Sequence, residues 1–264
     1  MPHAEANGIR IYYELSGLVD APVVMLSNSL GTRLEMWDLQ MAALTGRYRV
    51  LRYDSRGHGR SEAPPGPYSV AMLGEDARAL LDALGIAKVH FCGLSKGGMV
   101  GQWLGTHHGD HLLSLILCAT APRFRTAELW NQRIEQSARE GMASLVDDVT
   151  ERWFTAGYRA TPRPEIEQVR AMILATSPQG YGGCCAAIRD MDQSEAIRAI
   201  RTPTLIVAGA DDPATTIDVM RDLHERIPGS RFVAIPQAAH LLNIEQADRF
   251  NRTLTSFLDA PSRD

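Results

Sequence analysis

Residues 89–105, VHFCGLSKGGMVGQWLG, run from a short apolar stretch directly into a glycine-flanked serine and then into a helix-like pattern. The pattern G-x-S-x-G extends from Gly93 to Gly97 and is typical of a sharp turn between a strand and a helix. Side chains at the flanking positions would clash with their neighbours, so glycine is required there on steric grounds. We therefore predict that Ser95 is a nucleophile. Because the pattern is also common by chance, this interpretation depends on the rest of the chain.

The chain on both sides of this turn alternates between strand-like and helix-like segments. Short apolar or alternating runs predict strands at residues 9–15, 22–29, 48–54, 89–95, 112–120, 204–212 and 230–236. Helical spacing of apolar residues predicts helices at residues 36–44, 69–84 and 245–258. Strands separated by helices pair in parallel through right-handed crossovers. We expect an α/β fold with a mostly parallel central sheet.

The segment from residue 122 to residue 195 has a different pattern. Strand-like runs are missing there, and helical periodicity takes over, with the large aromatic residues Trp130, Trp153, Phe154 and Tyr158. We expect residues 122–195 to form a helical lid, or cap, inserted into a core of residues 1–121 and 196–264. The chain length of 264 residues suits one large domain with such an insertion.

Charge and hydrophobicity exclude several classes of protein. The net charge is -4, and basic and acidic residues are interspersed, so no basic face for nucleic acid is evident. The N-terminus lacks a basic segment followed by an apolar one, and no apolar run of about 18 residues occurs. We therefore expect a cytoplasmic protein that does not enter a membrane and that binds a small molecule. The sequence is compatible with a homo-oligomer.

Cysteine and histidine spacing argues against a metal site. The four cysteines show no C-x-x-C spacing, and in a reducing compartment we expect free thiols. His107 and His111 are four residues apart, but no glutamate completes the H-E-x-x-H arrangement of a zinc site. We expect no metal ion.

A nucleophilic serine needs a histidine to take its proton and a carboxylate to orient that histidine. After a G-x-S-x-G turn, the order along the chain is serine, then aspartate or glutamate, then histidine, each following a strand of the sheet. Asp211 and Asp212 both stand at the end of the predicted strand at 204–212, and His240 follows the one at 230–236. His58, in a glycine-rich loop, is a weaker candidate for the base.

Attack on an ester carbonyl produces a negatively charged oxygen, which two fixed backbone N–H groups would stabilise. The amide of Lys96 follows the nucleophile at the start of a helix, where the dipole also favours an anion. The second amide should come from the turn after the second predicted strand, which indicates Leu30. The Lys96 side chain opposes the same dipole, so we expect either a functional reason for it or plain solvent exposure.

These motifs together resemble the α/β-hydrolase superfamily over nearly the whole chain. Within it, the sequence is similar to the 3-oxoadipate enol-lactonases of bacterial aromatic catabolism. The resemblance rests on LSNSLGT, LRYDSRGHGRSEAP, GLSKGGMVGQWLG, AGADDPATT, AAHLLNIE and the segment Arg152-Trp153-Phe154-Thr155. It favours Asp212 over Asp211, because Gly209-x-x-Asp212 followed by Pro213 is the usual form of this turn in such enzymes. It implies a Ser95–Asp212–His240 triad acting through an acyl-enzyme, without metal or organic cofactor.

The implied substrate, 3-oxoadipate enol-lactone, bears a carboxylate and would need a cation in the pocket. Arg33, Lys96 and Arg133 are the candidates, and Trp130 and Trp153 are expected to wall the pocket or to form lid core. Two other functions remain open. One is a general carboxylesterase or perhydrolase-like enzyme, and the other is a ligand-sensing protein on a hydrolase scaffold.

Overall fold

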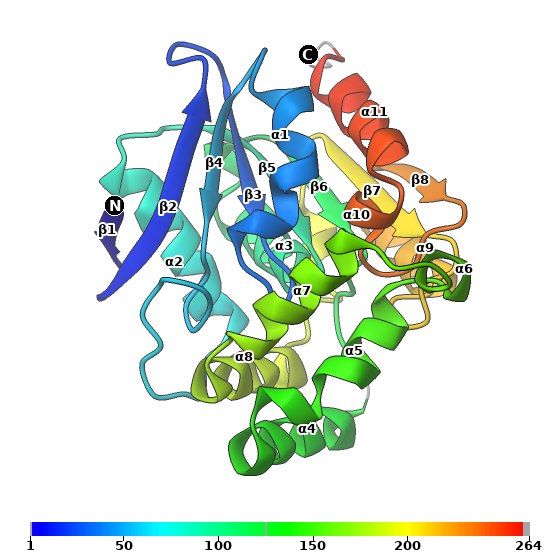
Figure 1. Cartoon of the computed structure of the whole chain (residues 1–264). Helices are drawn as coiled ribbons and strands as arrows, with labels where there is room; N and C mark the ends of the chain where they lie inside the picture. The colour runs from blue at the N-terminus through cyan, green and yellow to red at the C-terminus, as the bar shows by residue number, and fades with distance from the viewer. Residues whose placement is uncertain (1, 125, 261–264) are drawn as a thin grey trace.

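The computed structural model, shown in Figure 1, describes residues 2–124 and 126–260. Its central sheet has the order β1-β2-β4-β3-β5-β6-β7-β8. Strands β1 and β2 are antiparallel to each other, β2 is antiparallel to β4, and the remaining neighbours are parallel. The strands are β1 (His3–Ala6), β2 (Ile9–Gly17), β3 (Val23–Ser27), β4 (Arg49–Tyr53), β5 (Val89–Leu94), β6 (Leu112–Cys118), β7 (Thr204–Gly209) and β8 (Arg231–Ile235).

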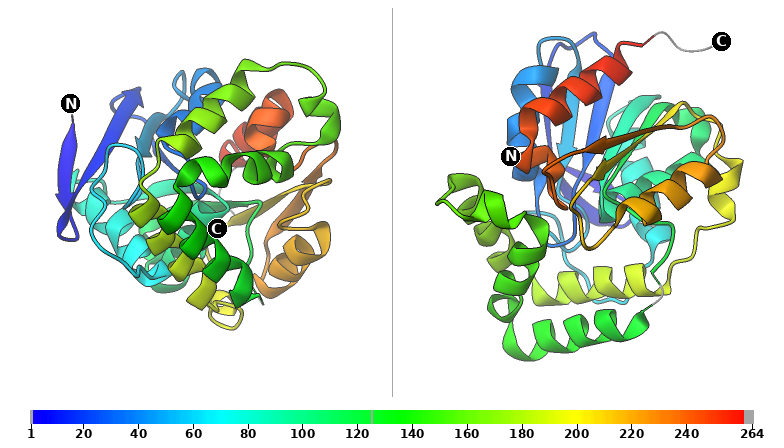
Figure 2. Two further views of the ribbon diagram at one scale, coloured as in Figure 1. Left: turned by 60° about the horizontal axis from the view of Figure 1, so that its bottom comes forward. Right: turned by 90° about the vertical axis from the view of Figure 1, so that its right-hand side faces the viewer.

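Helices cover both faces of this sheet. The right-hand view of Figure 2 shows α1 and α11 on one face and α3 and α9 on the other. The helices are α1 (Asp38–Leu44), α2 (Val70–Ala83), α3 (Lys96–His107), α4 (Ala127–Glu140), α5 (Val146–Trp153), α6 (Ala156–Arg159), α7 (Pro164–Leu174), α8 (Pro178–Asp190), α9 (Ile217–Arg226), α10 (Leu242–Glu245) and α11 (Ala247–Leu258). None of them, in the described part of the chain, is long and apolar enough to cross a bilayer.

The predicted α/β fold with a mostly parallel sheet is confirmed. Strands β3 and β7 are buried along their whole length, because helices cover both sides of a parallel sheet. The predicted helix at 69–84 is α2, which starts where the Ser69 hydroxyl accepts a hydrogen bond from the Met72 amide. It ends before Gly85, whose φ of 65° suits glycine.

Three elements of the structure differ from the sequence prediction. It missed β1, a four-residue edge strand too short to show a pattern. The helix predicted at 36–44 is a 3₁₀ turn at Leu34–Trp37 followed by α1, and the C-terminal helix is broken at Gln246 into α10 and α11.

The segment between β6 and β7 carries helices α4 to α8. The two ends of this segment meet, since the Gln193 amide donates to the Pro122 carbonyl (2.9 Å) and Arg123 pairs with Asp192 (3.5 Å). Figure 1 shows the segment beyond the ends of β3 to β7, where the parallel strands finish. In a parallel α/β sheet this is the edge at which ligands bind.

Candidate active site

Ser95 lies on a strained turn between β5 and α3. Its backbone has φ 56° and ψ -113°, a conformation that non-glycine residues rarely adopt. A Cβ atom on Gly93 would lie 2.1 Å from the Gly97 carbonyl oxygen, and one on Gly97 would lie 2.2 Å from the Ser27 carbonyl oxygen. Both glycines are therefore required by close backbone approach, as the sequence predicts. The Ser95 amide donates to the Cys118 carbonyl at 2.9 Å, which ties the turn to β6.

His240 and Asp212 are paired at the ends of β8 and β7. Nδ1 of His240 lies 2.8 Å from Oδ2 of Asp212, and both side chains are buried. Burial alone would raise the pKa of Asp212. The charge and hydrogen bond of His240, with further hydrogen bonds from Thr215 and Ala214, outweigh burial and lower that pKa. The neighbouring Asp211 is exposed, and its amide bonds only the Ala238 carbonyl. Of the two aspartates, Asp212 is the one that pairs with His240.

Contacts from the helical segment hold the residues around His240. The Trp153 ring stacks on the imidazole with 5.9 Å between centroids, and the Leu241 amide donates to the Trp153 carbonyl at 3.1 Å. The buried Glu245 carboxylate accepts from the Ala239 amide (2.8 Å) on one oxygen and from the amide and hydroxyl of Thr155 on the other.

Among the residues that the structure describes, the Ser95 hydroxyl forms no hydrogen bond with the His240–Asp212 pair. Catalytic hydrogen bonds are often long in the unliganded state and shorten only with substrate. The structure thus places Ser95, Asp212 and His240 after the parallel strands β5, β7 and β8 of one sheet and shows one of the two contacts that a triad requires.

The two backbone amides expected to stabilise an oxyanion, those of Leu30 and Lys96, have no protein acceptor in the described chain. Lys96 opens α3, where the helix dipole favours negative charge. Leu30 lies in the turn after β3, whose next residue, Gly31, has φ 75°. The Gly31 amide donates to Nε2 of His58 at 2.9 Å, and its carbonyl accepts from the Thr176 hydroxyl at 3.2 Å.

The Lys96 side chain is buried, with only 1% of the residue's surface exposed, so the expectation of plain solvent exposure is wrong. Its ammonium group donates to the Ser55 hydroxyl. Burial lowers the pKa of Lys96, while Cys184 and the carboxylates of Asp54 and Asp76 oppose this effect. An ammonium group bonded inside the core is a poor candidate for meeting a substrate.

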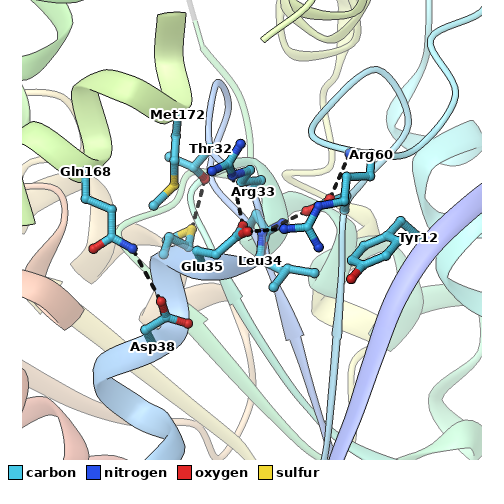
Figure 3. A network of polar contacts seen from close by, with 12 residues as sticks. Tyr12, Thr32, Arg33, Leu34, Glu35, Asp38, Arg60, Gln168 and Met172 are labelled. Carbon is cyan, nitrogen blue, oxygen red and sulfur yellow. Dashed lines mark hydrogen bonds and ion pairs between the residues drawn. The ribbon is translucent and has the colours of Figure 1, made fainter. Parts of the chain in front are cut away.

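Arg33 is occupied by an acidic neighbour. Its Nε lies 2.9 Å from Oε2 of Glu35, and Figure 3 shows Glu35 between Arg33 and Arg60. Arg60 also stacks over the Tyr12 ring, with 4.3 Å from its guanidinium carbon to the ring centroid. The charge of Arg33 is thereby largely neutralised within its own surface network.

A second group of cations lies in the helical segment and forms no ion pair with the described residues. Neither Arg133 of α4 nor Arg152 of α5 forms an ion pair with any residue in the described ranges. Burial lowers the pKa of Arg152 and the like charge of Arg133 lowers it further, while Tyr181 and the Asp148 carboxylate oppose this effect. Both also lie within electrostatic range of Tyr181, which packs against Gly31.

Trp130 adds an unused donor to this group. The Arg133 guanidinium lies 5.0 Å from the Trp130 ring centroid, and the buried indole Nε1 has no hydrogen-bond partner among the described residues. Trp130 and Arg133 were predicted from the sequence as residues of the substrate pocket, whereas Arg152 was not predicted to contact a substrate. Arg152 lies next to Trp153, which stacks on His240, and only the fold reveals that it is unpaired.

His107, His111 and the four cysteines either bond backbone carbonyls or pack in the interior. His107 stacks on Trp103 (4.7 Å) and bonds the Trp103 carbonyl, and His111 bonds the Ala87 carbonyl. The four cysteines are free and buried. In the described chain, no three His, Cys, Asp or Glu side chains gather in a way that could hold a metal ion.

Comparison with known proteins identifies the family. The profile of the alpha/beta hydrolase family matches residues 17–253. The 3-oxoadipate enol-lactonase 2 of Acinetobacter baylyi (strain ATCC 33305 / BD413 / ADP1) is 36% identical over 253 residues, which cover 96% of this chain and 94% of that protein. The putative carbamate hydrolase RutD of Caulobacter sp. (strain K31) is 31% identical, covering 94% of this chain and 95% of that protein. The crystal structure of the enol-lactonase from Burkholderia xenovorans LB400 has 42% identity and a TM-score of 0.96, covering 98% of this chain and 100% of that one. The chain therefore belongs to the alpha/beta hydrolase family and is a hydrolase.

Proposed function

We propose that this protein hydrolyses 3-oxoadipate enol-lactone to 3-oxoadipate through an acyl-enzyme on Ser95. The observations that carry the reaction type are the buried His240–Asp212 pair and the strained Ser95 turn, which follow parallel strands of one sheet. Similarity to enol-lactonases over nearly the whole chain supports the choice of substrate.

In the proposed reaction, Ser95 Oγ attacks the lactone carbonyl carbon while His240 Nε2 takes the hydroxyl proton. Asp212 holds Nδ1–H of the imidazole, so that Nε2 is free to accept. The amides of Leu30 and Lys96 stabilise the oxyanion. The ring C–O bond then breaks, and His240 returns the proton to the leaving enol oxygen. The enol tautomerises to the ketone as its hydroxyl proton is lost and a carbon–hydrogen bond forms. A water molecule activated by His240 hydrolyses the acyl-serine and releases the second carboxylate.

We propose further that Arg133, Arg152 and the Trp130 indole bind the carboxylate of the substrate. The guanidinium groups of Arg133 and Arg152 repel each other by more than the Asp148 carboxylate offsets, and an anion between them would remove that repulsion. The pairing of Arg33 with Glu35 and of Lys96 with Ser55 argues against the other two candidate cations.

Residues 122–195 would then serve as a cap on a core of residues 1–121 and 196–264. Trp153 against His240 and the Glu245 bonds to Thr155 join cap and core beside the proposed site. The cap would exclude water and carry the residues that recognise the substrate.

Steady-state kinetics on the enol-lactone and on a neutral aryl acetate test this proposal. Ser95→Ala should abolish turnover of both. Arg133→Met and Arg152→Met should each raise KM for the enol-lactone by roughly 10- to 150-fold, from the loss of about 1.5–3 kcal/mol of charge-assisted hydrogen bonding. KM for the uncharged ester should change little.

Arg139→Met is the matched control, because Arg139 lies on the same helix and pairs with Glu140 at the surface (3.0 Å). Equal effects of Arg133→Met on the charged and the neutral substrate would contradict carboxylate recognition. Faster turnover of aryl acetates or carbamates than of the enol-lactone would contradict the substrate assignment.

A further inference from the structure

We propose that His58 is a positioning residue that holds the oxyanion turn in place through the Gly31 amide. This inference rests on the proposed role of the Leu30 amide in catalysis. His58 belongs to the RGHG loop after β4, which the proposed reaction otherwise leaves unused. Its side chain is buried, with 1% of the residue exposed, and reaches across to the turn after β3.

The hydrogen bonds of His58 determine which ring nitrogen carries the proton. Nε2 lies 2.9 Å from the Gly31 amide, which can only donate, so Nε2 must be the bare acceptor. Nδ1 lies 3.1 Å from the Arg56 carbonyl, which can only accept, so Nδ1 must carry the hydrogen. His58 is therefore neutral with the proton on Nδ1. Either the other tautomer or the imidazolium would turn an N–H toward the Gly31 N–H.

The surroundings of His58 favour this neutral form. Burial lowers the pKa of His58 well below its usual value, and the positive charge of Lys96 lowers it further. The Arg56 carbonyl opposes this through its hydrogen bond to the ring. The Arg56 side chain is itself fixed by a buried ion pair with Asp76, at 2.6 and 2.7 Å.

Gly31 needs such an anchor because its backbone is permissive. With φ at 75° and no Cβ, it accepts more than one orientation of the Leu30–Gly31 peptide plane. The orientation of that plane sets ψ of Leu30, so fixing it fixes the path of the turn that carries the Leu30 amide. His58 holds the N–H of this peptide, and Thr176 holds the Gly31 carbonyl from the helical segment.

Two substitutions at this position separate the proposal from a general packing role. His58→Gln keeps an acceptor near the place of Nε2, within reach of the Gly31 amide. His58→Asn keeps a polar group near the place of Nδ1, facing the Arg56 carbonyl, but has no acceptor for Gly31. A packing role predicts equal effects, whereas the proposal predicts that only the Asn variant loses transition-state stabilisation.

The experiment measures kcat and KM on an aryl acetate, together with the affinity for a phenylboronic acid as a mimic of the tetrahedral intermediate. For His58→Asn we expect kcat to fall by about 10- to 100-fold, less than the loss of a whole oxyanion donor, with KM nearly unchanged. Boronic acid affinity should fall by a similar factor. His58→Gln should recover most of both. The control is His224→Asn, since His224 bonds Ser230 at the remote α9–β8 turn.

Equal losses in the Gln and Asn variants, or none in either, would overturn the proposal. Nitrogen NMR of wild-type protein labelled at histidine gives a test that needs no variant. His58 should show a protonated Nδ1 and a bare Nε2 at neutral pH, and a protonated Nε2 would overturn the assignment. The failure of the underlying function is distinguishable, because Ser95→Ala would then remain active whatever the His58 variants do.

Discussion

Exchanging the buried carboxylate of Asp212 for an amide gives the sharpest test of the proposed triad. Oδ1 of Asp212 accepts from the amides of Ala214 (2.7 Å) and Thr215 (3.2 Å), and Oδ2 accepts from the Thr215 hydroxyl (2.5 Å) and faces His240. In Asp212→Asn, the amide oxygen must stay toward the two backbone donors. The NH₂ group then faces Nδ1 of His240 and forces the proton onto Nε2, where it blocks acceptance from Ser95.

We expect kcat to fall by roughly 10³- to 10⁴-fold, the scale known for the equivalent change in a serine protease triad. At 1.36 kcal/mol per factor of ten, this is about 4–5.5 kcal/mol of transition-state stabilisation. Initial rates of aryl acetate hydrolysis at neutral pH measure it. Asp211→Asn is the matched control, since Asp211 is exposed and uses only its backbone amide in the turn. The reasoning is refuted if Asp212→Asn keeps more than about a tenth of wild-type kcat, or if Asp211→Asn loses as much.

Other perturbations test the frame around the site. Asp76→Ala should lower the free energy of unfolding by about 3–5 kcal/mol, measured by urea titration, because it leaves Arg56 buried and unpaired. Gly97→Ala should abolish activity and destabilise the protein in thermal melts, because the new methyl group would lie 2.2 Å from the Ser27 carbonyl oxygen. Gly157→Ala is the control. It places a methyl group with no atom within 4 Å and should be neutral or slightly stabilising. The buried cysteines should react with a thiol reagent only after unfolding, and rapid labelling of the native protein would contradict their burial.

The sequence by itself determined those features that depend on neighbouring residues. The period of apolar residues sets strand against helix, and alternation of the two predicts a parallel sheet with its loops at one edge. The glycines around Ser95 follow from close backbone approach within one turn. The order of serine, aspartate and histidine is also visible in the sequence, because each residue comes at the end of its own predicted strand.

Tertiary structure decided which charged side chains remain available, because counterions come from distant parts of the chain. Arg33 is paired with its near neighbour Glu35, and only the fold shows that this carboxylate also binds Arg60 from another loop. The sequence left open whether the Lys96 side chain is exposed or functional, and the fold buries it against Ser55, 41 residues away. Arg152 was noted in the sequence only as part of the segment Arg152-Trp153-Phe154-Thr155, since its lack of an ion-pair partner can be seen only once the chain is folded.

The turn after β3 shows the same division between local and long-range information. A glycine-containing turn was readable from its composition, but its anchor, His58, lies 27 residues further along the chain. The tautomer of that histidine is set by one backbone donor and one backbone acceptor that only the fold brings to opposite sides of its ring. Local sequence thus specifies where the chain turns, and long-range hydrogen bonds and charges specify what each turn presents to a substrate.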